Sequence, residues 1–314
     1  MDIKIGRQVL TWGTGDLLFI NDLFPKDWKA FFIGRDDEYL KAPSNAVKMS
    51  FFFNPANIDL VLSPVFDGSN YIDGERISYW NGILGRRAGR DFVFGDRERN
   101  HFPEDWEVSL RVSKNIGGVE AAAYGYSGYW KTPEGLDPGA LKLYYPKLTA
   151  VGVSVRATVF GGIGNLEAGY YHSEEDTKGD NPFIRNSEMR FLAGFERELA
   201  RNLTGSVQYY LEWMADYDAY RENLRGQPAR DELRHVTTLR LTRLMMNQNL
   251  TLSFFAYYSP SDRDGYIRPK VKYKITDRWS AELGGNLFFG QEDHTFFGQF
   301  ERNTNAYVGI RLGF

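Results

Sequence analysis

Four cations occupy alternate positions in one short stretch of the sequence: Arg268, Lys270, Lys272 and Lys274. Side chains two residues apart in a strand share a face, so this spacing predicts a row of positive charge along one side of a strand. Such a row can attract anions, because a wall of one sign concentrates its counter-ion. Acidic neighbours on adjacent strands, Glu282 among them, can instead neutralise the row. Both interpretations stay open.

A second set of cations lies in residues 67–104, a long stretch without strand periodicity. Its members are Arg76, Arg86, Arg87, Arg90, Arg97 and Arg99. Guanidinium groups suit carboxylates and phosphates, which they bind at two points in one plane. Aromatic residues such as Trp80 and Phe92 lie among these arginines, and this content disfavours a loop that stays dissolved in water. We expect this long connection to be functional.

Residues that would indicate an enzyme or a metal site are sparse. The chain has no Cys, and its histidines are isolated, with no spacing suited to a metal: His101, His172, His235 and His294. A hydrolase is the enzyme alternative, with His172 beside Ser173 or His101 near Asp105 as the reacting pair. His172 falls on the apolar side of its segment, which argues against the first pair. We therefore expect no enzymatic activity, no cofactor and no metal.

Strands are the elements that position these residues. Between residues 203 and 214, Val207, Tyr209 and Leu211 alternate with Gln208 and Tyr210. This period of two, apolar on one face and polar on the other, is typical of a barrel strand. The pattern predicts fourteen strands, near residues 2–12, 46–54, 57–66, 105–115, 118–130, 147–160, 165–174, 186–199, 203–214, 233–246, 249–259, 265–276, 278–290 and 303–314. Most have about the nine to eleven residues, or slightly more, with which a tilted strand crosses a bilayer.

The connections between these strands alternate between tight and long. The tight ones lie at residues 54–57, 115–118, 161–164, 200–202, 247–249 and 276–278. The others extend from a handful of residues, 261–264, to the long stretches 13–45 and 67–104. Short turns on one rim and long loops on the other are typical of outer-membrane barrels. A soluble β-sandwich, the alternative, explains the alternating faces but gives no reason for the alternating loop lengths.

Composition agrees with an all-β membrane protein. The chain is 16% aromatic and has no apolar run near the roughly 20 residues that a transmembrane helix needs. A net charge of -3 gives no basic excess for binding nucleic acid. We predict one domain, residues 1–314, that forms a transmembrane, antiparallel, up-and-down β-barrel. No signal peptide follows Met1, so this prediction requires that one was removed.

Two parts of the sequence resemble known barrels. The run from Ala306 to Phe314, with alternate apolar residues and a final Phe, resembles the last strand of outer-membrane proteins. This resemblance implies insertion by the barrel-assembly machinery. The motif Gly6-Arg7-Gln8, followed by residues 9–13, 22–25, 39–43, 145–152 and 208–213, resembles a family of poorly characterised bacterial porin-like barrels, and the motif is also similar to alginate-export barrels. In such families a strand pair precedes the motif, which implies sixteen strands in the native barrel.

A barrel of fourteen or more strands is too wide for side chains to pack across it, so we expect a channel. Its lining or constriction is predicted to include Arg76, Arg86, Arg87, Arg90, Arg97, Arg99, Arg240, Arg268, Lys270, Lys272, Lys274, Glu282 and Arg311. Residues 13–45 and 67–104 are expected to fold into the interior or against the rim. Alternatively, residues 67–104 form an extracellular flap that contacts lipopolysaccharide or neighbouring loops.

The expected function is passive diffusion of small hydrophilic solutes through the bacterial outer membrane. Anions or carboxylates are the class that the basic row would favour. Both termini are expected in the periplasm, and the expected partners are the solute, membrane lipid, lipopolysaccharide and, during insertion, the assembly machinery. A scaffold for another envelope component is the alternative function, and an outer-membrane hydrolase is a weaker one. The outward faces do not distinguish a monomer from an oligomer.

Overall fold

One large antiparallel sheet makes up most of the protein. The computed structural model describes residues 1–97, 99, 101–102, 104–224 and 226–313, so the predicted terminal Phe314 lies outside the described residues. In this part of the chain fourteen strands form a single sheet, and each pairs with the next one along the sequence. They are β1 (Asp2–Val9), β2 (Pro43–Phe52), β3 (Asn57–Ser63), β6 (Glu107–Ile116), β7 (Val119–Tyr129), β10 (Lys147–Val159), β11 (Gly162–Ser173), β12 (Glu188–Ala200), β13 (Leu203–Met214), β14 (Leu233–Met245), β15 (Leu250–Ser259), β16 (Asp264–Lys274), β17 (Trp279–Gly290) and β18 (Asn305–Leu312). The fourteen predicted strands are confirmed, with ends that differ by a few residues.

Cross-strand pairing brings like faces together around the sheet. Tyr126, Ala150 and Tyr171 lie side by side on β7, β10 and β11, and all three are buried. The intervening residues Val151 and Val153 point the other way and are exposed. Because side chains alternate along every strand, the curved sheet has a buried inward face and an apolar outward face.

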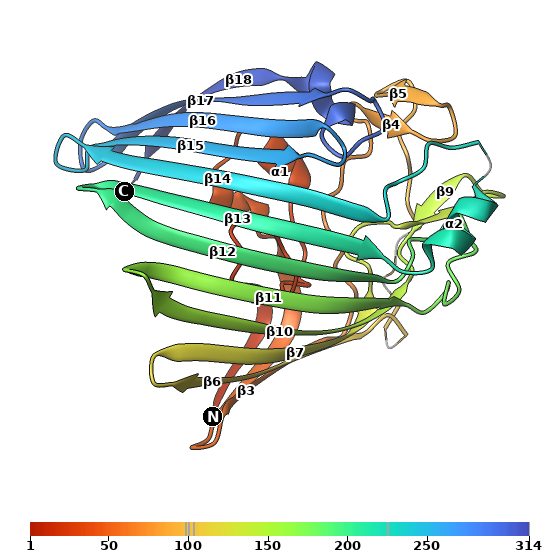
Figure 1. Ribbon diagram of the computed structural model, residues 1–314, viewed down its shortest axis with the longest axis horizontal. Coiled ribbons are helices and arrows are strands. Elements are labelled where there is room, and N and C mark those ends of the chain that lie inside the picture. Colours follow the sequence, from red (N-terminus) through yellow and green to blue (C-terminus); the bar gives the residue numbers. More distant parts are fainter. Residues whose placement is uncertain (98, 100, 103, 225, 314) are drawn as a thin grey trace.

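The two ends of the sheet differ in their connections (Figure 1). Tight turns join the strands at one end, where Gly161, Asn202 and Asn247 have positive φ angles of 69°, 60° and 53°. Glycine and asparagine tolerate this backbone region better than other residues. The other end carries longer connections with small elements: the hairpins β4 (Tyr79–Asn81) with β5 (Arg86–Ala88) and β8 (Gly135–Asp137) with β9 (Lys142–Tyr144), the helix α2 (Tyr217–Asn223) and the 3-10 helix η2 (Gly298–Asn303). The sequence pattern did not predict these small elements.

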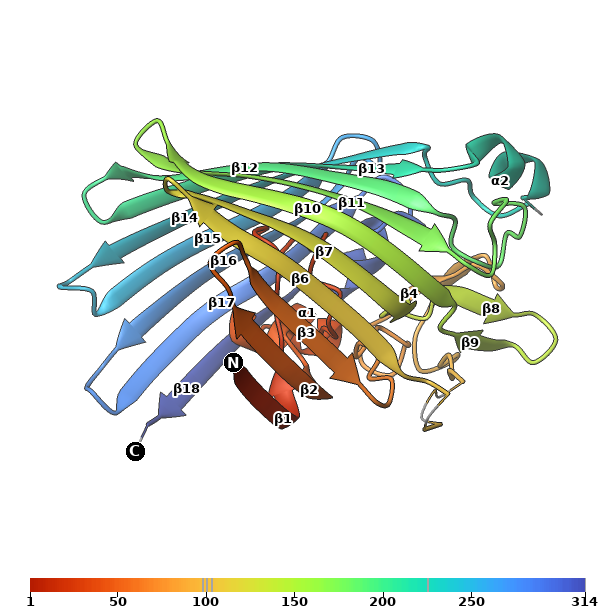
Figure 2. The ribbon, with the colours of Figure 1, turned by 90° about the horizontal axis from the view of Figure 1, so that it is seen from below.

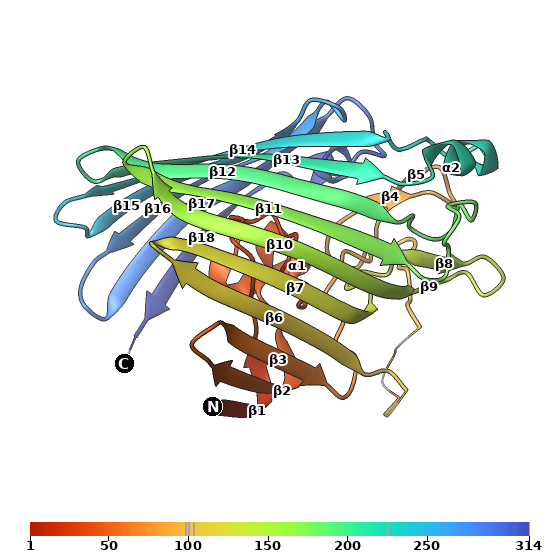
Figure 3. The same ribbon diagram turned by 60° about the horizontal axis from the view of Figure 1, so that its bottom comes forward.

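The sheet curls toward a barrel, but its edge strands do not pair with each other. Figure 2 and Figure 3 show the strands wrapping around a common interior, with β1 and β18 as the two edges of the sheet. Within the described residues, β1 forms a ladder only with β2, and β18 only with β17. The up-and-down order is therefore as predicted, whereas the expected closure of the barrel is not observed and the wall is open along this seam.

The connection from β1 to β2 runs back inside the curved sheet. We call residues 10–42 the interior segment. It contains the short helix α1 (Trp28–Phe32), whose N-cap Asp27 accepts a hydrogen bond from Ala30 N at 2.7 Å, and the 3-10 helix η1 (Asp37–Leu40). The views agree that the strands enclose α1 (Figures 1 to 3). No helix in the described chain combines the length and the apolar character needed to span a bilayer.

Aromatic contacts hold the interior segment against the wall. Phe32 is buried, and its ring centroid lies 5.7, 5.3 and 5.0 Å from those of Tyr266, Phe288 and Phe300. Other deeply buried residues of the segment are Ile20, Phe31 and Leu40. Burial of one such side chain stabilises by about 1.5–3 kcal/mol. This part of the interior is therefore a packed core.

The chain contains no Cys, so a single introduced cysteine can report whether its position on β10 faces outward or inward. Val153 is 53% exposed, whereas Ser154 is 5% exposed and its Oγ lies 2.9 Å from Tyr124 OH. In detergent micelles we expect Val153→Cys to react readily with an apolar maleimide, as followed by mass spectrometry. Ser154→Cys should react at least about tenfold more slowly, since the reaction requires local opening and about 1.4 kcal/mol corresponds to tenfold. Equal rates would contradict the assigned faces.

Candidate functional site

The row of cations on β16 lies on the inward face of the sheet. The side chains become more exposed along the strand, from 3% for Arg268 through 18% for Lys270 and 39% for Lys272 to 49% for Lys274. Lys274 is next to the tight turn and pairs with Asp277 at 2.7 Å. The other three cations extend from there into the interior of the sheet.

Two aspartates of the interior segment neutralise this row. Asp36 lies 3.1 Å from Lys270 Nζ and 3.8 Å from Lys272 Nζ. Asp37 Oδ1 lies 2.8 Å from Arg268 Nη1. Glu282 is opposite Lys272 in the strand register and contacts Asp36, so it belongs to the same cluster. The sequence had suggested neutralisation across neighbouring strands, yet Asp36 and Lys270 are 234 residues apart in the chain.

Strands β14 and β18 bring two further cations to the same place. Arg240 lies 3.0 Å from Asp16 Oδ1 and 3.2 Å from Asp37 Oδ2. Arg311 lies 2.8 Å from Asp36 Oδ2. We call this group the cationic wall: Arg240, Arg268, Lys270, Lys272 and Arg311. Three strands thus converge on two adjacent carboxylates of the interior segment.

The ionisation of Asp36 follows from this setting. Burial raises the pKa of its carboxyl group, but Lys270, Lys272 and Arg311 together outweigh that effect, so the pKa lies below its ordinary value of 3.8. Asp36 is therefore negatively charged at neutral pH. Its ion pairs stabilise the docked segment above the ordinary pKa, and this stabilisation is lost as the pH falls through the lowered value.

Glu167 on β11 anchors the beginning of the interior segment. Its buried carboxylate accepts hydrogen bonds from Thr14 Oγ1 at 2.8 Å, Gly15 N at 2.8 Å and Asn21 Nδ2 at 2.9 Å. These hydrogen bonds satisfy the buried carboxylate and fix the beginning of the segment against β11. Sequence reasoning did not identify this anchor, because the residues that it binds belong to a distant connection without periodicity.

Two wall glycines make room for the same part of the segment. A side chain on Gly169 would begin 2.7 Å from Ile20 Cγ2, and one on Gly152 would begin 1.9 Å from Asn21 Oδ1. Gly152 and Gly169 are direct partners on β10 and β11. A larger residue at either position would collide with the segment, so the wall is shaped to receive it. These paired inward glycines are a sequence signal that could have revealed the contact.

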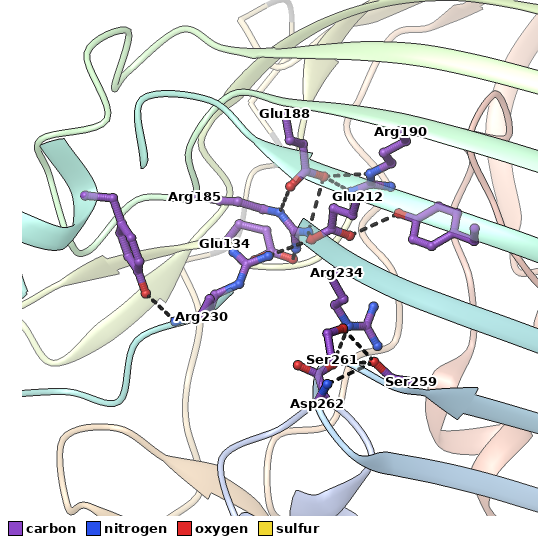
Figure 4. A network of polar contacts seen from close by, with 12 residues as sticks. Glu134, Arg185, Glu188, Arg190, Glu212, Arg230, Arg234, Ser259, Ser261 and Asp262 are labelled. Carbon is purple, nitrogen blue, oxygen red and sulfur yellow. Dashed lines mark hydrogen bonds and ion pairs between the residues drawn. The ribbon is translucent and has the colours of Figure 1, made fainter. Parts of the chain in front are cut away.

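A separate ionic network lies near the long-loop end of the sheet (Figure 4). Arg185 contacts Glu134, Glu188 and Glu212 at 3.1, 2.9 and 2.9 Å, and Arg230 contacts Glu212 at 2.7 Å. Glu188 and Glu212 are buried. Removing one partner from such a network leaves an uncompensated charge and costs about 3–5 kcal/mol. We interpret this network as a structural brace of the wall, since its charges already have partners within the chain.

The arginines of residues 67–104 are held by contacts among the long connections. Arg87 lies 2.8 Å from Asp293 and 3.0 Å from Glu301, which fixes the β4–β5 hairpin next to η2. The other contacts are Arg86 with Asp91, Arg90 with the carbonyl of Glu75, Arg97 with Asp137 and Arg99 with Asp105, while Arg76 is exposed. Among the described residues, the carboxylates that form ion pairs with the cationic wall belong to the interior segment, and none belongs to residues 67–104.

The two residue pairs that suggested a hydrolase differ in geometry. His172 and Ser173 are consecutive in β11 and point to opposite faces, and His172 Nδ1 lies 3.5 Å from Ser187 Oγ instead. His101 Nδ1 does lie 3.3 Å from Asp105 Oδ2, but Arg99 shares that carboxylate. Among the described residues there is no group of three or more His, Asp or Glu that could hold a metal ion.

The lowered pKa of Asp36 can be measured by NMR. With ¹³C-labelled aspartate in micelles, we expect its carboxyl resonance, assigned by its absence in Asp36→Asn, to titrate below 3.8. Lys270→Gln should raise this pKa, because it removes a neighbouring cation. Lys274→Gln is the control on the same strand and should leave it unchanged. A wild-type pKa at or above the ordinary value would contradict the assigned ion pairs.

A larger side chain at Gly169 should weaken the packing of the interior segment against the wall. Gly169→Leu places atoms where Ile20 lies, and overpacking costs about 1–3 kcal/mol, so we expect trypsin to cleave after Lys26 and Lys29 about tenfold faster than in the wild type. Gly125→Leu is the matched control, since the space around that outward position is open to 4 Å. Electrophoresis and mass spectrometry report the cleavage. Equal rates in the two variants would show that the packing at Gly169 does not hold the segment.

Comparison with known proteins gives distant likenesses to porins. No family model and no curated protein matches the sequence. A porin structure refined at 1.8 Å has 10% sequence identity and a TM-score of 0.46, and the match covers 86% of this chain and 91% of that one. A mutant of the Rh. blastica porin has 10% identity and a TM-score of 0.42 over 89% and 80%, and the KdgM porin has 11% identity and a TM-score of 0.30 over 67% and 94%. The similarity of Gly6-Arg7-Gln8 to alginate-export barrels gains no support here, and the fold described above rests on this chain's own strand pairing.

Proposed function

We propose that the protein is an outer-membrane channel for small hydrophilic solutes and that the interior segment obstructs it. The observation that carries this proposal is the opposite character of the two faces of the sheet. The outward face exposes apolar side chains on strand after strand, whereas the inward face carries charged residues such as Glu167, Arg240 and Arg268 along the middle of the strands. A continuous apolar surface of this extent calls for a lipid environment.

Aromatic residues near both ends of the strands support the same environment. Trp213 and Tyr258 are exposed toward the long-loop end, and Phe160 and Trp279 are exposed toward the tight-turn end. Aromatic girdles of this kind flank the apolar band of outer-membrane barrels at the two membrane interfaces. We therefore propose that the strands cross the bilayer with the tight turns, and hence both termini, on the periplasmic side. Lipopolysaccharide would then contact the long loops.

The solute class follows from the charges of the wall. The five cations of the cationic wall face one nearby wall carboxylate, Glu282, once the aspartates of the interior segment are set aside. An interior with excess positive charge favours anions. We propose anionic solutes, and carboxylates among them, as the preferred class.

The packed interior favours a second candidate function. Phe31, Phe32 and Leu40 fill space that an open porin would leave to water. A barrel with a filled interior can serve as a scaffold or partner for another envelope component. Conduction distinguishes this candidate from a channel.

Planar-bilayer recordings test conduction. We expect low stepwise conductance from the wild type and a larger one from a variant in which a Gly-Ser linker of equal length replaces residues 13–41. The wall strands of that variant keep their own hydrogen bonds, so circular dichroism should still report the sheet. If the folded linker variant conducts no more than lipid alone, the channel proposal is overturned and the scaffold is favoured.

Reversal potentials in a salt gradient test the selectivity. In the linker variant, Lys270→Gln with Lys272→Gln should shift the reversal potential toward cations, because two charges of the interior are removed. Lys114→Gln removes a cation from the outward face of β6 and should have no effect. An unchanged reversal potential in the double variant would exclude these lysines from the conducting path.

A further inference from the structure

We infer that the cationic wall is a binding site for compounds that carry two or more carboxylates, and that Asp36 and Asp37 occupy this site as a built-in competitor. The inference rests on the proposed function in one respect: the ligand is the solute that the channel takes up. Binding itself requires only the wall, so it can be tested without a membrane.

The geometry of the wall fits a ligand with more than one carboxylate. Lys270, Lys272 and Arg311 surround the carboxylate of Asp36, and Arg240 and Arg268 hold that of Asp37. These cations come from three strands and converge on two neighbouring anionic groups. Guanidinium and ammonium groups placed in this way recognise carboxylates by charge and by hydrogen-bond direction.

When the interior segment is displaced, the cations of the wall lose the carboxylates that neutralise them. Arg240, Phe255 and Arg268 lie in one cross-strand row. The Arg240 guanidinium lies 4.5 Å from the ring centroid of Phe255, and the Arg268 guanidinium lies 4.5 Å from that of Phe31 in the interior segment. Both guanidinium groups pair with the carboxylate of Asp37, so its removal leaves two nearby cations without this counter-charge. Asp37 now supplies that counter-charge, and a free carboxylate can supply it equally well.

Arg268 is not fully satisfied by the interior segment. Its side chain is 3% exposed, yet within the described chain its Nε and Nη1 atoms have no hydrogen-bond partner. Asp37 lies near enough for an ion pair but does not meet the guanidinium edge with hydrogen-bond geometry. The Nη2 of Arg268 donates to the carbonyl oxygen of Arg35, so displacement of residues 34–39 frees that atom as well. A carboxylate that is not tied to the backbone can then bridge Nη2 and Nε at two points, a contact that Asp37 does not make.

The acidic stretch is attached separately from the apolar anchor. Phe31 and Phe32 are buried, whereas Arg35, Glu38 and Tyr39 are exposed. Between them lies Gly34, whose φ angle of 96° is strained for other residues. Residues 34–39 can therefore leave the wall as a loop while Phe32 before them and the buried Leu40 after them stay in place. Solvent already reaches the site from this side, because Lys272 and Arg311 are partly exposed.

Competition of this kind has a measurable consequence. A ligand that binds only when residues 34–39 are displaced has an apparent affinity reduced by the fraction of molecules in that state. Weakening the competitor without changing the wall must raise the apparent affinity. Weakening the wall must lower it.

Isothermal titration calorimetry in detergent tests the site with citrate, a tricarboxylate, and with acetate at the same ionic strength. We expect Asp36→Asn with Asp37→Asn to bind citrate at least about tenfold more tightly than the wild type, because the competing charges are gone. Adding Lys270→Gln and Lys272→Gln should abolish this gain. The inference is overturned if the first variant binds citrate no more tightly than the wild type does, or no more tightly than it binds acetate.

Asp277→Asn is the matched control for the loss of a carboxylate near β16. Asp277 pairs with Lys274 at the tight turn and does not belong to the site. We expect this variant to bind citrate as the wild type does. An increase in citrate affinity equal to that of the Asp36 and Asp37 variant would indicate a general charge effect and would contradict the proposal that these two aspartates compete with the ligand.

A disulfide tests whether the displacement is local. The Cβ position of Gly169 lies 2.7 Å from Ile20 Cγ2, which is compatible with the Cβ separation of about 3.5–4.5 Å in disulfides. Ile20→Cys with Gly169→Cys should therefore fix the beginning of the segment and leave residues 34–39 free. We expect equal citrate affinity in the oxidised and reduced forms. Loss of binding on oxidation, restored by reduction, would overturn local displacement.

The binding and conduction experiments fail independently. If the citrate affinities of the variants follow the expected order but the linker variant does not conduct, the proposed binding site stands and the proposed channel function is rejected. If the linker variant conducts in steps but the citrate affinities do not follow the expected order, the channel function stands and the proposed competition by Asp36 and Asp37 is rejected.

Discussion

Charge pairing between Asp36, Asp37 and the cationic wall is the interaction on which the interior of this protein depends. A sheet of this width encloses more space than its own side chains fill, and charges buried there require partners. The interior segment meets both requirements, because Phe31 and Phe32 occupy the space and the two aspartates neutralise the wall. The position of the segment and the charges of β14, β16 and β18 are therefore mutually dependent.

The strands could be predicted because their signal is local. Strand β13 is predicted at residues 203–214 and observed at Leu203–Met214, since alternation is read from residues only two positions apart. The open seam between β1 and β18 has no such signal, because pairing between the first and last strands is a property of the whole sheet. The β4–β5 and β8–β9 hairpins were missed for a different reason: three residues are too few to establish a period.

The sequence predicted the cations of the candidate site but not the carboxylates that bind them. Spacing alone identified the cations of β16, whereas the aspartates that bind them lie in a connection without periodicity. Some residue types on the inward face nevertheless indicate that a segment packs against it. Tyr266 and Phe288 are aromatic, and Gly152 and Gly169 are small, at positions where a water-filled interior would favour polar side chains. Each departure coincides with a place where the interior segment packs.

Two kinds of contact hold the interior segment, and they respond differently to solutes. Ion pairs weaken with salt and can exchange one carboxylate for another, whereas apolar burial involves no counter-ion that a solute could replace. A gate that required Phe31 and Phe32 to enter water would cost about 1.5–3 kcal/mol for each ring. A gate limited to residues 34–39 replaces one set of charge contacts with a similar set, so its net cost is smaller. Because Gly34 separates the two kinds of contact along the chain, the segment can remain seated in the wall and still give up the cations to a competing anion.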